Sequence, residues 1–212
     1  MNTKNKLNNY AFIDSQNLNL GVRSMGWKLD YKKFRLYLRN KYEVVNAYMF
    51  IGMVVNNQAL YTKLQEAGFI LVFKPTVQYF QDGKPTVKGN VDAELVLYAA
   101  AIEYQNYDKA IVVSGDGDFH CLVRFLDEND KLLHLMAPNK QFSKLLREFS
   151  KYIVLVDSLR NSLEFKNNKK SRDWRSVETL GLPGHGDTKN IAKKPKKVNK
   201  VPLKENKGNN KK

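Results

Sequence analysis

Ile111-Val-Val-Ser-Gly-Asp-Gly-Asp-Phe119 is the stretch from which both the fold and the chemistry of this chain can be predicted. Its three β-branched apolar residues are typical of a strand that is buried on both faces of a parallel sheet. Gly115 permits a sharp turn directly after that strand. Asp116 and Asp118 follow, and ligands of open parallel sheets bind at the carboxyl ends of the strands. The stretch therefore predicts two acids at a functional edge, although either acid could simply cap the next helix.

Apolar runs of strand length alternate with stretches of helical periodicity up to about Asp157. The predicted strands are Tyr10–Asp14, Val44–Met53, Phe69–Phe73, Ala110–Val113, Lys131–Met136 and Tyr152–Val156, with Val77–Phe80 and Thr86–Lys88 forming a hairpin. The predicted helices are Tyr31–Asn40, a segment that starts at Asn56 and is closed by Gly68, Val91–Tyr104, Phe119–Glu128 and Gln141–Ser150, while Ser15–Gly21 is predicted to be a polar turn. This alternation predicts a three-layer α/β/α domain around a central, mainly parallel sheet with right-handed crossovers.

The 212-residue chain has room for one such domain and an appendage. Apolar periodicity ends after Phe165, and from Lys189 onward the residues are mostly Lys, Asn and Pro. Such a composition cannot bury enough apolar surface to fold. We therefore place the domain at residues 1–165 and a disordered, basic tail at residues 166–212.

The formal charge of +15 is concentrated in that tail. Residues 166–212 hold 15 Lys and Arg against 4 Asp and Glu, whereas the rest of the chain holds 21 against 17. A polycation of this kind favours a polyanionic partner, most simply nucleic acid, unless it serves only solubility. Lys193, Lys194, Lys196 and Lys197 form its densest cluster, and Trp174 could stack on a base.

The number of cysteines and the length of the apolar runs indicate the cellular compartment in which the protein is expected. The single cysteine, Cys121, excludes an internal disulfide and is expected in the core rather than as a nucleophile. No apolar run approaches the ~20 residues of a membrane helix, and no apolar segment before Tyr10 resembles a secretory signal. These observations predict a cytoplasmic protein that does not span a membrane.

Acids recur at predicted strand ends and helix starts. The set is Asp14, Asp92, Asp116 and Asp118, with Glu94 and Asn17 nearby. Carboxylates that converge repel one another unless a cation lies between them, and oxygen ligands without a Cys or His cluster suit Mg²⁺ or Mn²⁺. Such cations activate water for phosphodiester hydrolysis. The less specific explanation for Asp92 and Glu94 is that acids in a first helical turn are favoured by the helix dipole.

Several other chemistries lack their motifs in this chain. There is no Gly-x-x-x-x-Gly-Lys-Ser/Thr phosphate loop, no Gly-x-Ser-x-Gly elbow, and no Gly-x-Gly-x-x-Gly after the first strand. A haloacid-dehalogenase-like phosphatase would need Asp-x-Asp after that strand, where this chain has Asp14-Ser15-Gln16. His120 stands alone beside the acids and is expected to be structural.

Three blocks in order give the chain a specific family resemblance. They are Phe12-Ile-Asp-Ser-Gln-Asn-Leu18, Lys88-Gly-Asn-Val-Asp92 and Val113-Ser-Gly-Asp-Gly-Asp-Phe119. Together they resemble the signatures of the NYN domain, the LabA-like branch of the PIN-like nuclease superfamily. Its members typically show Phe-Ile-Asp-Gly-x-Asn-Leu, Lys-Gly-x-Asp and Val-Ser-Gly-Asp-Ser-Asp-Phe. The resemblance covers roughly Ala11 to Leu159 and implies a PIN-like, Rossmann-like fold.

The resemblance also implies a site. By position it makes Asp14, Asp92, Asp116 and Asp118 the catalytic, metal-binding acids, Asn17 and Ser114 their polar helpers, and Glu94 the only candidate for a further acid. Ser15 stands where many members carry Gly, and Gly117 where many carry Ser. Neither difference removes a carboxylate. RNA is the substrate that the resemblance implies.

Two functions of different classes follow. The first is a Mg²⁺- or Mn²⁺-dependent endoribonuclease that hydrolyses phosphodiester bonds through the four acids. The alternative is a non-catalytic RNA-binding module with a PIN-like fold. In either case the expected partners are single-stranded RNA, contacted by Lys88 and the tail lysines, and, as one option, a second copy of the chain in a homodimer.

Overall fold

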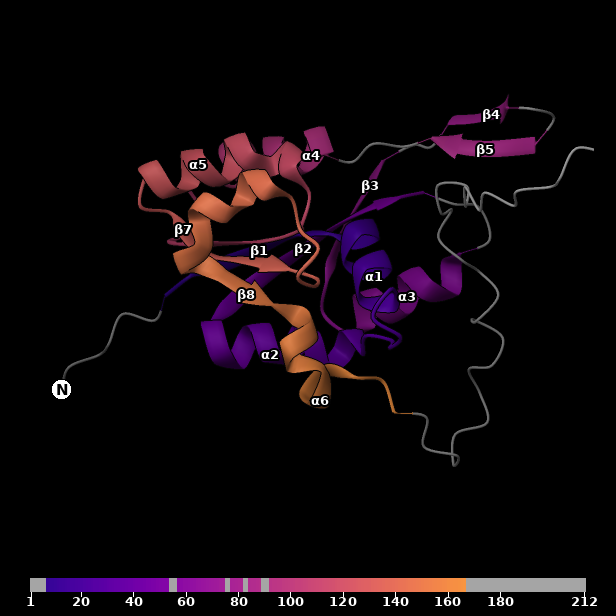
Figure 1. The fold of residues 1–212 in the computed structure, drawn as a ribbon, viewed down its shortest axis with the longest axis horizontal. Helices are drawn as coiled ribbons and strands as arrows, with labels where there is room; N and C mark the ends of the chain where they lie inside the picture. The colour runs from indigo at the N-terminus through magenta and orange to yellow at the C-terminus, as the bar shows by residue number, and fades with distance from the viewer. Residues whose placement is uncertain (1–6, 54–56, 75–76, 82–83, 89–91, 167–212) are drawn as a thin grey trace, which may run out of the picture.

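A six-stranded parallel sheet forms the centre of the protein in the computed structural model, which describes residues 7–53, 57–74, 77–81, 84–88 and 92–166 (Figure 1). The order across the sheet is β3-β2-β1-β6-β7-β8, and every neighbouring pair is parallel. The strands are β1 Asn9–Asp14, β2 Val44–Gly52, β3 Ile70–Lys74, β6 Ala110–Val113, β7 Leu132–Ala137 and β8 Ile153–Leu155. The predicted α/β class with a mainly parallel central sheet is confirmed.

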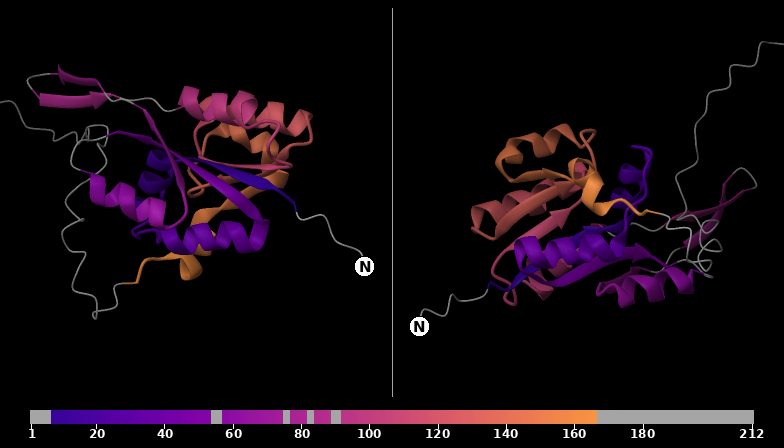
Figure 2. Two further views of the ribbon diagram at one scale, coloured as in Figure 1. Left: turned by 180° about the vertical axis from the view of Figure 1, so that it is seen from behind. Right: turned by 90° about the horizontal axis from the view of Figure 1, so that it is seen from below.

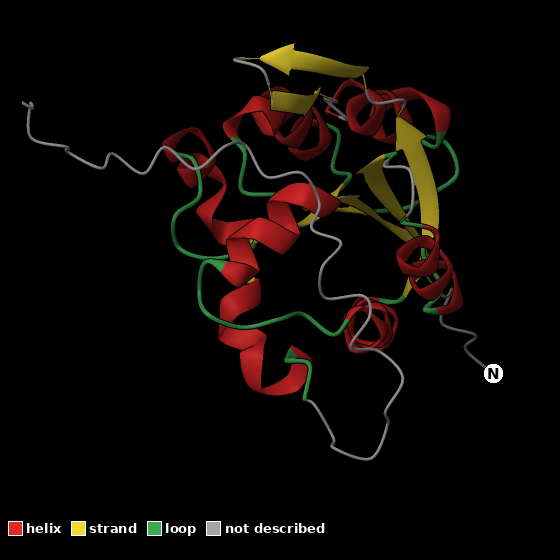
Figure 3. Ribbon diagram, turned by 90° about the vertical axis from the view of Figure 1, so that its right-hand side faces the viewer, coloured by secondary structure: helices red, strands yellow, loops and turns green. Residues whose placement is uncertain are grey.

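Helices cover both faces of this sheet (Figures 1 and 3). The α-helices are α1 Ser15–Arg23, α2 Tyr31–Tyr42, α3 Gln58–Glu66, α4 Asp92–Leu97, α5 His120–Glu128 and α6 Arg160–Leu163. The π-helix η1 Tyr98–Ile102 continues α4, and the 3₁₀ segments are η2 Gly117–Phe119, η3 Lys144–Tyr152 and η4 Val156–Leu159. The predicted hairpin is present as the antiparallel pair β4 Val77–Gln81 and β5 Lys84–Lys88, which extends away from the sheet (Figure 1).

Alternation along the strands produces two apolar layers. In β1, Ala11 and Ile13 face the layer formed with α1, α2, α3 and α6, whereas Tyr10 and Phe12 face the layer formed with α4, α5 and η3. All six residues of β1 are buried, because this central strand is covered on both faces. The views from behind and from below show the same two helix layers (Figure 2).

The order in which the chain adds strands to the sheet reverses at β1. The chain runs outward from β1 to β2 and β3, then returns to place β6 on the other side of β1. Ligands of open α/β sheets bind outside the carboxyl ends of the strands at such a switch point. Ile13 pairs with Val113 in this register, so Asp14, the last residue of β1, and Ser114, which follows β6, lie at the same edge. This topology determines where the candidate site lies.

The prediction of a polar turn at Ser15–Gly21 is wrong, because this segment belongs to helix α1. Asp14 caps the helix by accepting a hydrogen bond from the backbone N–H of Asn17. Leu18 and Val22, four residues apart, are buried against the sheet. The short amphipathic pattern was masked by the surrounding Asn and Gln residues.

Three further differences concern helices. The predicted helix Val91–Tyr104 is divided into α4 and the π-helix η1, and the predicted helix Gln141–Ser150 is the 3₁₀ segment η3. Cys121 is exposed, contrary to the expectation of a core residue, because α5 buries Leu122, Val123 and Leu126 instead.

Within the described residues, no helix is long and apolar enough to cross a membrane. The predicted basic tail lies outside the described residues, apart from Lys166 at its start.

Candidate active site

Asp14 and Ser114 meet at the carboxyl edge of the sheet. Asp14 is 6% exposed, and its Oδ1 accepts a hydrogen bond from the Asn17 backbone N–H at 3.0 Å. Its Oδ2 accepts a hydrogen bond from the fully buried Ser114 hydroxyl at 3.3 Å. Both oxygens of this buried carboxylate are therefore held in place by neighbours on α1 and after β6.

A chain of hydrogen bonds continues from this pair to the other acids. The Asn17 amide oxygen accepts from the Gly115 backbone N–H at 2.8 Å, which joins α1 to the loop after β6. The Ser114 hydroxyl accepts from the Asp116 backbone N–H at 3.1 Å. Asp116 in turn caps η2 by accepting from the Asp118 backbone N–H at 3.1 Å. The capping explanation thus holds for Asp116, which leaves its second carboxylate oxygen available.

Three carboxylates act on one another electrostatically here. The pKa of Asp14 is raised from its usual 3.8 to about 6, mainly by burial, with repulsion from Asp92 and Asp116 adding to the shift. The hydrogen bonds from Asn17 and Ser114 oppose that shift. Asp92 and Asp116 therefore each lie close enough to Asp14 to disfavour its charged form, although the three acids come from separate segments.

The remaining predicted residues lie differently. Asp118 is exposed at the start of the next helix. Glu94 is bonded to Lys74 of β3 at 3.1 Å, so its carboxylate has a cationic partner. Lys88 is the last residue of β5, and the tail lysines Lys193, Lys194, Lys196 and Lys197 lie outside the described residues. The catalytic, metal-binding and nucleic-acid-binding roles assigned to these side chains stay predictions.

The segment Pro138–Ser143, which joins β7 to η3, packs against both acid-bearing segments. Asn139 donates to the Gly21 carbonyl of α1 at 2.7 Å, and a Cβ at Gly21 would lie 2.5 Å from Pro138. Ser143 donates its backbone N–H to the Gly115 carbonyl at 2.9 Å. We call these six residues the bridging segment, because they connect α1 with the loop of Asp116 and Asp118.

Sequence reasoning did not find the bridging segment. Only its glycine partners could have indicated it, since glycine often marks a close backbone approach. A Cβ at Gly115 would lie 3.1 Å from Phe142, and a Cβ at Gly117 would overlap the Ser143 hydroxyl. No pattern in the sequence connects these glycines with residues some 25 positions further on.

His120, which is expected to be structural, contacts η3. Its Nε2 is hydrogen-bonded to the Glu148 carboxylate, and its ring lies 5.6 Å from that of Phe149. These contacts connect the start of α5 with η3. They place His120 in the support of the acid loop rather than among the acids.

The donor set fits a hard divalent cation in its chemistry. Asp14, Asp92 and Asp116 offer carboxylate oxygens, Asp14 and Asp116 are mutually repulsive, and no sulfur ligand accompanies them. In the described part of the chain, however, no three His, Cys, Asp or Glu side chains have the arrangement of a metal site. A cation would have to draw these carboxylates together.

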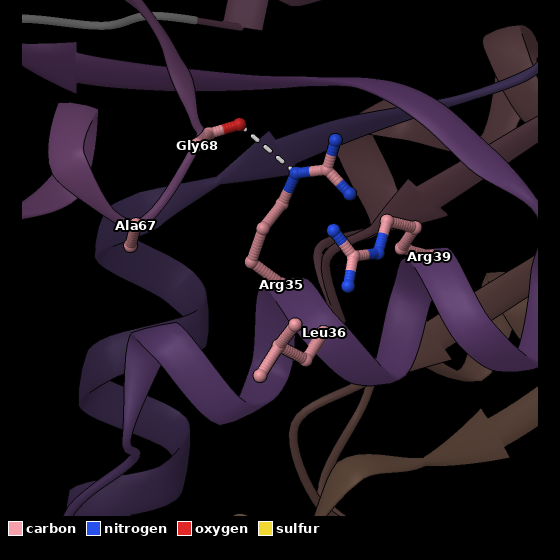
Figure 4. Close-up of a pocket in the computed structure, with 5 residues that line it drawn as sticks. All are labelled: Arg35, Leu36, Arg39, Ala67 and Gly68. Carbon is pink, nitrogen blue, oxygen red and sulfur yellow. Dashed lines mark hydrogen bonds between the residues drawn. The ribbon is translucent and has the colours of Figure 1, made fainter.

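A small pocket of about 100 Å³ lies elsewhere, lined by Arg35, Leu36, Arg39, Ala67 and Gly68 (Figure 4). Arg35 donates to the carbonyls of Gly68, Val44 and Val45, at 2.9, 3.1 and 2.6 Å. These carbonyls precede or begin β3 and β2, so the pocket is at the amino edge of the sheet, opposite the acids. Arg35 therefore connects α2 by hydrogen bonds to the start of β2 and to Gly68 before β3.

The fold and this edge define an α/β domain with the buried Asp14 at the switch point of a parallel sheet. Comparison with known proteins names the family. The NYN domain model matches residues 10–158, and the chain belongs to the NYN domain family, in its LabA-like branch. NYN domains are part of the PIN-like nuclease superfamily, which indicates a nuclease- or RNA-related role.

Two individual proteins are similar to this chain. The Low amplitude and bright protein LabA of Synechococcus elongatus is 22% identical over 160 residues, which are 72% of this chain and 86% of that protein. A crystal structure of a protein of unknown function from Vibrio parahaemolyticus is similar with a TM-score of 0.64 and 25% identity, over 78% of this chain and 100% of that one.

Proposed function

We propose that this protein is a divalent-metal-dependent endoribonuclease acting on single-stranded RNA. The observation that carries the proposal is the buried Asp14 at the switch point of the sheet, whose pKa is raised to about 6 mainly by burial and further by the nearby carboxylates of Asp92 and Asp116. Folding carboxylates into such proximity is unfavourable without a counter-charge. Membership of a PIN-like family supports the nuclease class.

The residues of the site have separable roles in this proposal. Asp14, Asp92 and Asp116 would hold Mg²⁺ or Mn²⁺, and the exposed Asp118 would complete the acid set. The bound cation supplies activation of water and stabilisation of negative charge on the phosphate. Ser114 fixes the orientation of the Asp14 carboxylate by donating to its Oδ2. Asn17 keeps the loop of Asp116 against α1 through the Gly115 N–H.

The non-catalytic RNA-binding module is the second candidate. The specific observation in its favour is that no three acids among the described residues are arranged as a metal site. In that case the lysines of the tail, with Lys88, would bind RNA in the cytoplasm without hydrolysis. The two candidates differ in turnover and share the same partner.

A cleavage assay separates them. The full-length protein is incubated with a fluorescent single-stranded RNA in Mn²⁺, in Mg²⁺ and in EDTA, and the products are resolved by length. Internal cleavage with either cation and none in EDTA supports the endoribonuclease. Binding of the RNA with intact length in all three buffers supports the binding module instead.

A further inference from the structure

Ser143 lies against the backbone between the two acids of the loop after β6. Its backbone N–H donates to the Gly115 carbonyl at 2.9 Å. A Cβ built on Gly117 would overlap the Ser143 hydroxyl oxygen and lie 3.0 Å from the Ser143 Cβ. Ser143 and a side chain at position 117 would thus occupy the same space, directly between Asp116 and Asp118 along the chain.

The hydroxyl of Ser143 has an unused donor. Its oxygen accepts only a long bond of 3.4 Å from the Leu145 N–H, as the cap of η3. Among the described residues no acceptor takes its proton. The Ser143 residue is half-buried, so its side chain is not closed off from solvent. A hydroxyl donor suits a phosphate oxygen, which is an acceptor only.

Asn139, Pro138 and Phe142 hold Ser143 in that position. Asn139 donates to Gly21 of α1, while Pro138 and Phe142 lie within 3.3 Å of where a Cβ at Gly115 would be. The bridging segment is therefore fixed at both ends to the segments that carry Asp14 and Asp116. A donor on such a support is held in place beside the loop of Asp116 and Asp118 before any ligand binds.

We propose that Ser143 is a substrate-binding residue of the acid site, whose hydroxyl donates to a phosphate oxygen of the bound RNA strand. This inference rests on the proposed function for the identity of the substrate. Gly117 has no side chain and therefore no hydroxyl, so the bridging segment supplies the hydroxyl through Ser143. The hydroxyl can come from position 143 or position 117, and a side chain at both positions would require the Ser143 hydroxyl to rotate away and the two Cβ atoms to move apart.

The test removes the hydroxyl and then returns it from the opposite side of the same space. Ser143→Gly deletes it, and glycine replaces serine at a cap with little effect on stability. The double variant Gly117→Ser with Ser143→Gly restores a hydroxyl there. The matched control is Ser150→Gly, the same change at an exposed position of η3. Affinity for a fluorescent single-stranded RNA is measured in EDTA, and kcat and KM in Mn²⁺.

We expect Ser143→Gly to weaken RNA binding about tenfold, the loss of one hydrogen bond to a charged group. The double variant should regain wild-type affinity to within about threefold, while Ser150→Gly leaves the affinity unchanged. Wild-type affinity in Ser143→Gly, or a folded double variant as weak as Ser143→Gly, would overturn the proposal. If the wild type binds RNA but never cleaves it, the nuclease proposal fails and the affinities still decide the role of Ser143.

Discussion

Asp14 links the stability of the fold to the chemistry of its acid edge. Its raised pKa means that the folded state favours the neutral carboxyl. The corresponding stability is fully present below about pH 3.8 and is lost as the pH rises through about 6. At neutral pH without a cation, this side chain therefore destabilises the protein.

Asp14→Asn should accordingly raise the free energy of unfolding of the metal-free protein by about 2 kcal/mol at pH 8. Asparagine is also an effective helix cap, so α1 should keep its start. Urea unfolding in EDTA at pH 4 and pH 8 measures the effect, which should vanish at pH 4. A variant no more stable than the wild type at pH 8 would show that burial and the neighbouring acids do not disfavour the charged Asp14 carboxylate.

Gly21 illustrates how position decides a residue's effect. In a helix interior, Gly→Ala normally stabilises by about 1 kcal/mol. At Gly21 the new Cβ would lie 2.5 Å from Pro138, a distance that real contacts do not reach. We expect Gly21→Ala to destabilise the protein by about 1–3 kcal/mol, as overpacking does. Chemical unfolding measures this, and a stabilised variant would mean that the bridging segment does not press against α1.

At the scale of elements, α2 is attached to the sheet through Arg35. Three carbonyls at the amino edge accept from its guanidinium, and the bond to Gly68 is drawn in Figure 4. Helix α2 also contributes the buried Phe34 and Leu38 to one apolar layer. Burial and the neighbouring Arg39 lower the pKa of Arg35. The group nevertheless stays charged, because its ordinary pKa is far above neutrality.

Arg35→Gln should lower the free energy of unfolding by about 2 kcal/mol, because carbonyls that faced a charged donor lose it. Arg39→Gln is the matched control, since Arg39 makes one weak bond to Asn40 at 3.3 Å. We expect less than about 0.5 kcal/mol there. Equal losses in the two variants, measured by thermal and urea unfolding, would contradict the structural role of Arg35.

Much of the element pattern was predictable because the strands are buried on both faces. Ala110–Val113 reads as strand from composition alone, and β6 has the same bounds. Segments stabilised by tertiary contacts were not predictable. The helix α1 depends on Asp14 as a cap and on burial of Leu18 and Val22, and the π-helix η1 has no local signal.

The candidate site was predictable only as far as motifs reach. The strand-end rule and the three family blocks indicated Asp14, Asp92 and Asp116, and in the fold Asp92 and Asp116 lie near enough to Asp14 to raise its pKa. Ser143 carries no motif, because its relation to Gly117 exists only in three dimensions. Glu94 looked like a site acid in sequence, yet it pairs with Lys74.

For the whole molecule, the distribution of charge separates binding from chemistry. The tail from Lys166 carries 15 of the 36 Lys and Arg residues. A truncation that ends at Phe165 should bind single-stranded RNA more weakly at low salt. Each lost phosphate contact flattens the slope of log affinity against log salt by about 0.7. The truncated protein should still cleave excess substrate, because none of the candidate metal ligands is removed.

Affinities at several salt concentrations check this prediction. Equal salt slopes for the truncated and full-length proteins would show that the tail is not the electrostatic anchor for RNA. The charge of the tail would then serve solubility or another partner.

The central claim is that the acid edge hydrolyses RNA, and Asp116→Asn tests it most directly. Cleavage of a single-stranded RNA in Mn²⁺ is compared for the wild type, Asp116→Asn and Asp130→Asn, with folding checked by circular dichroism. Asp130 is an exposed acid beside Lys109, so its substitution matches the charge change away from the site. We predict wild-type cleavage by Asp130→Asn and a loss of at least about a hundredfold in Asp116→Asn. Equal cleavage by Asp116→Asn and the wild type would contradict the account.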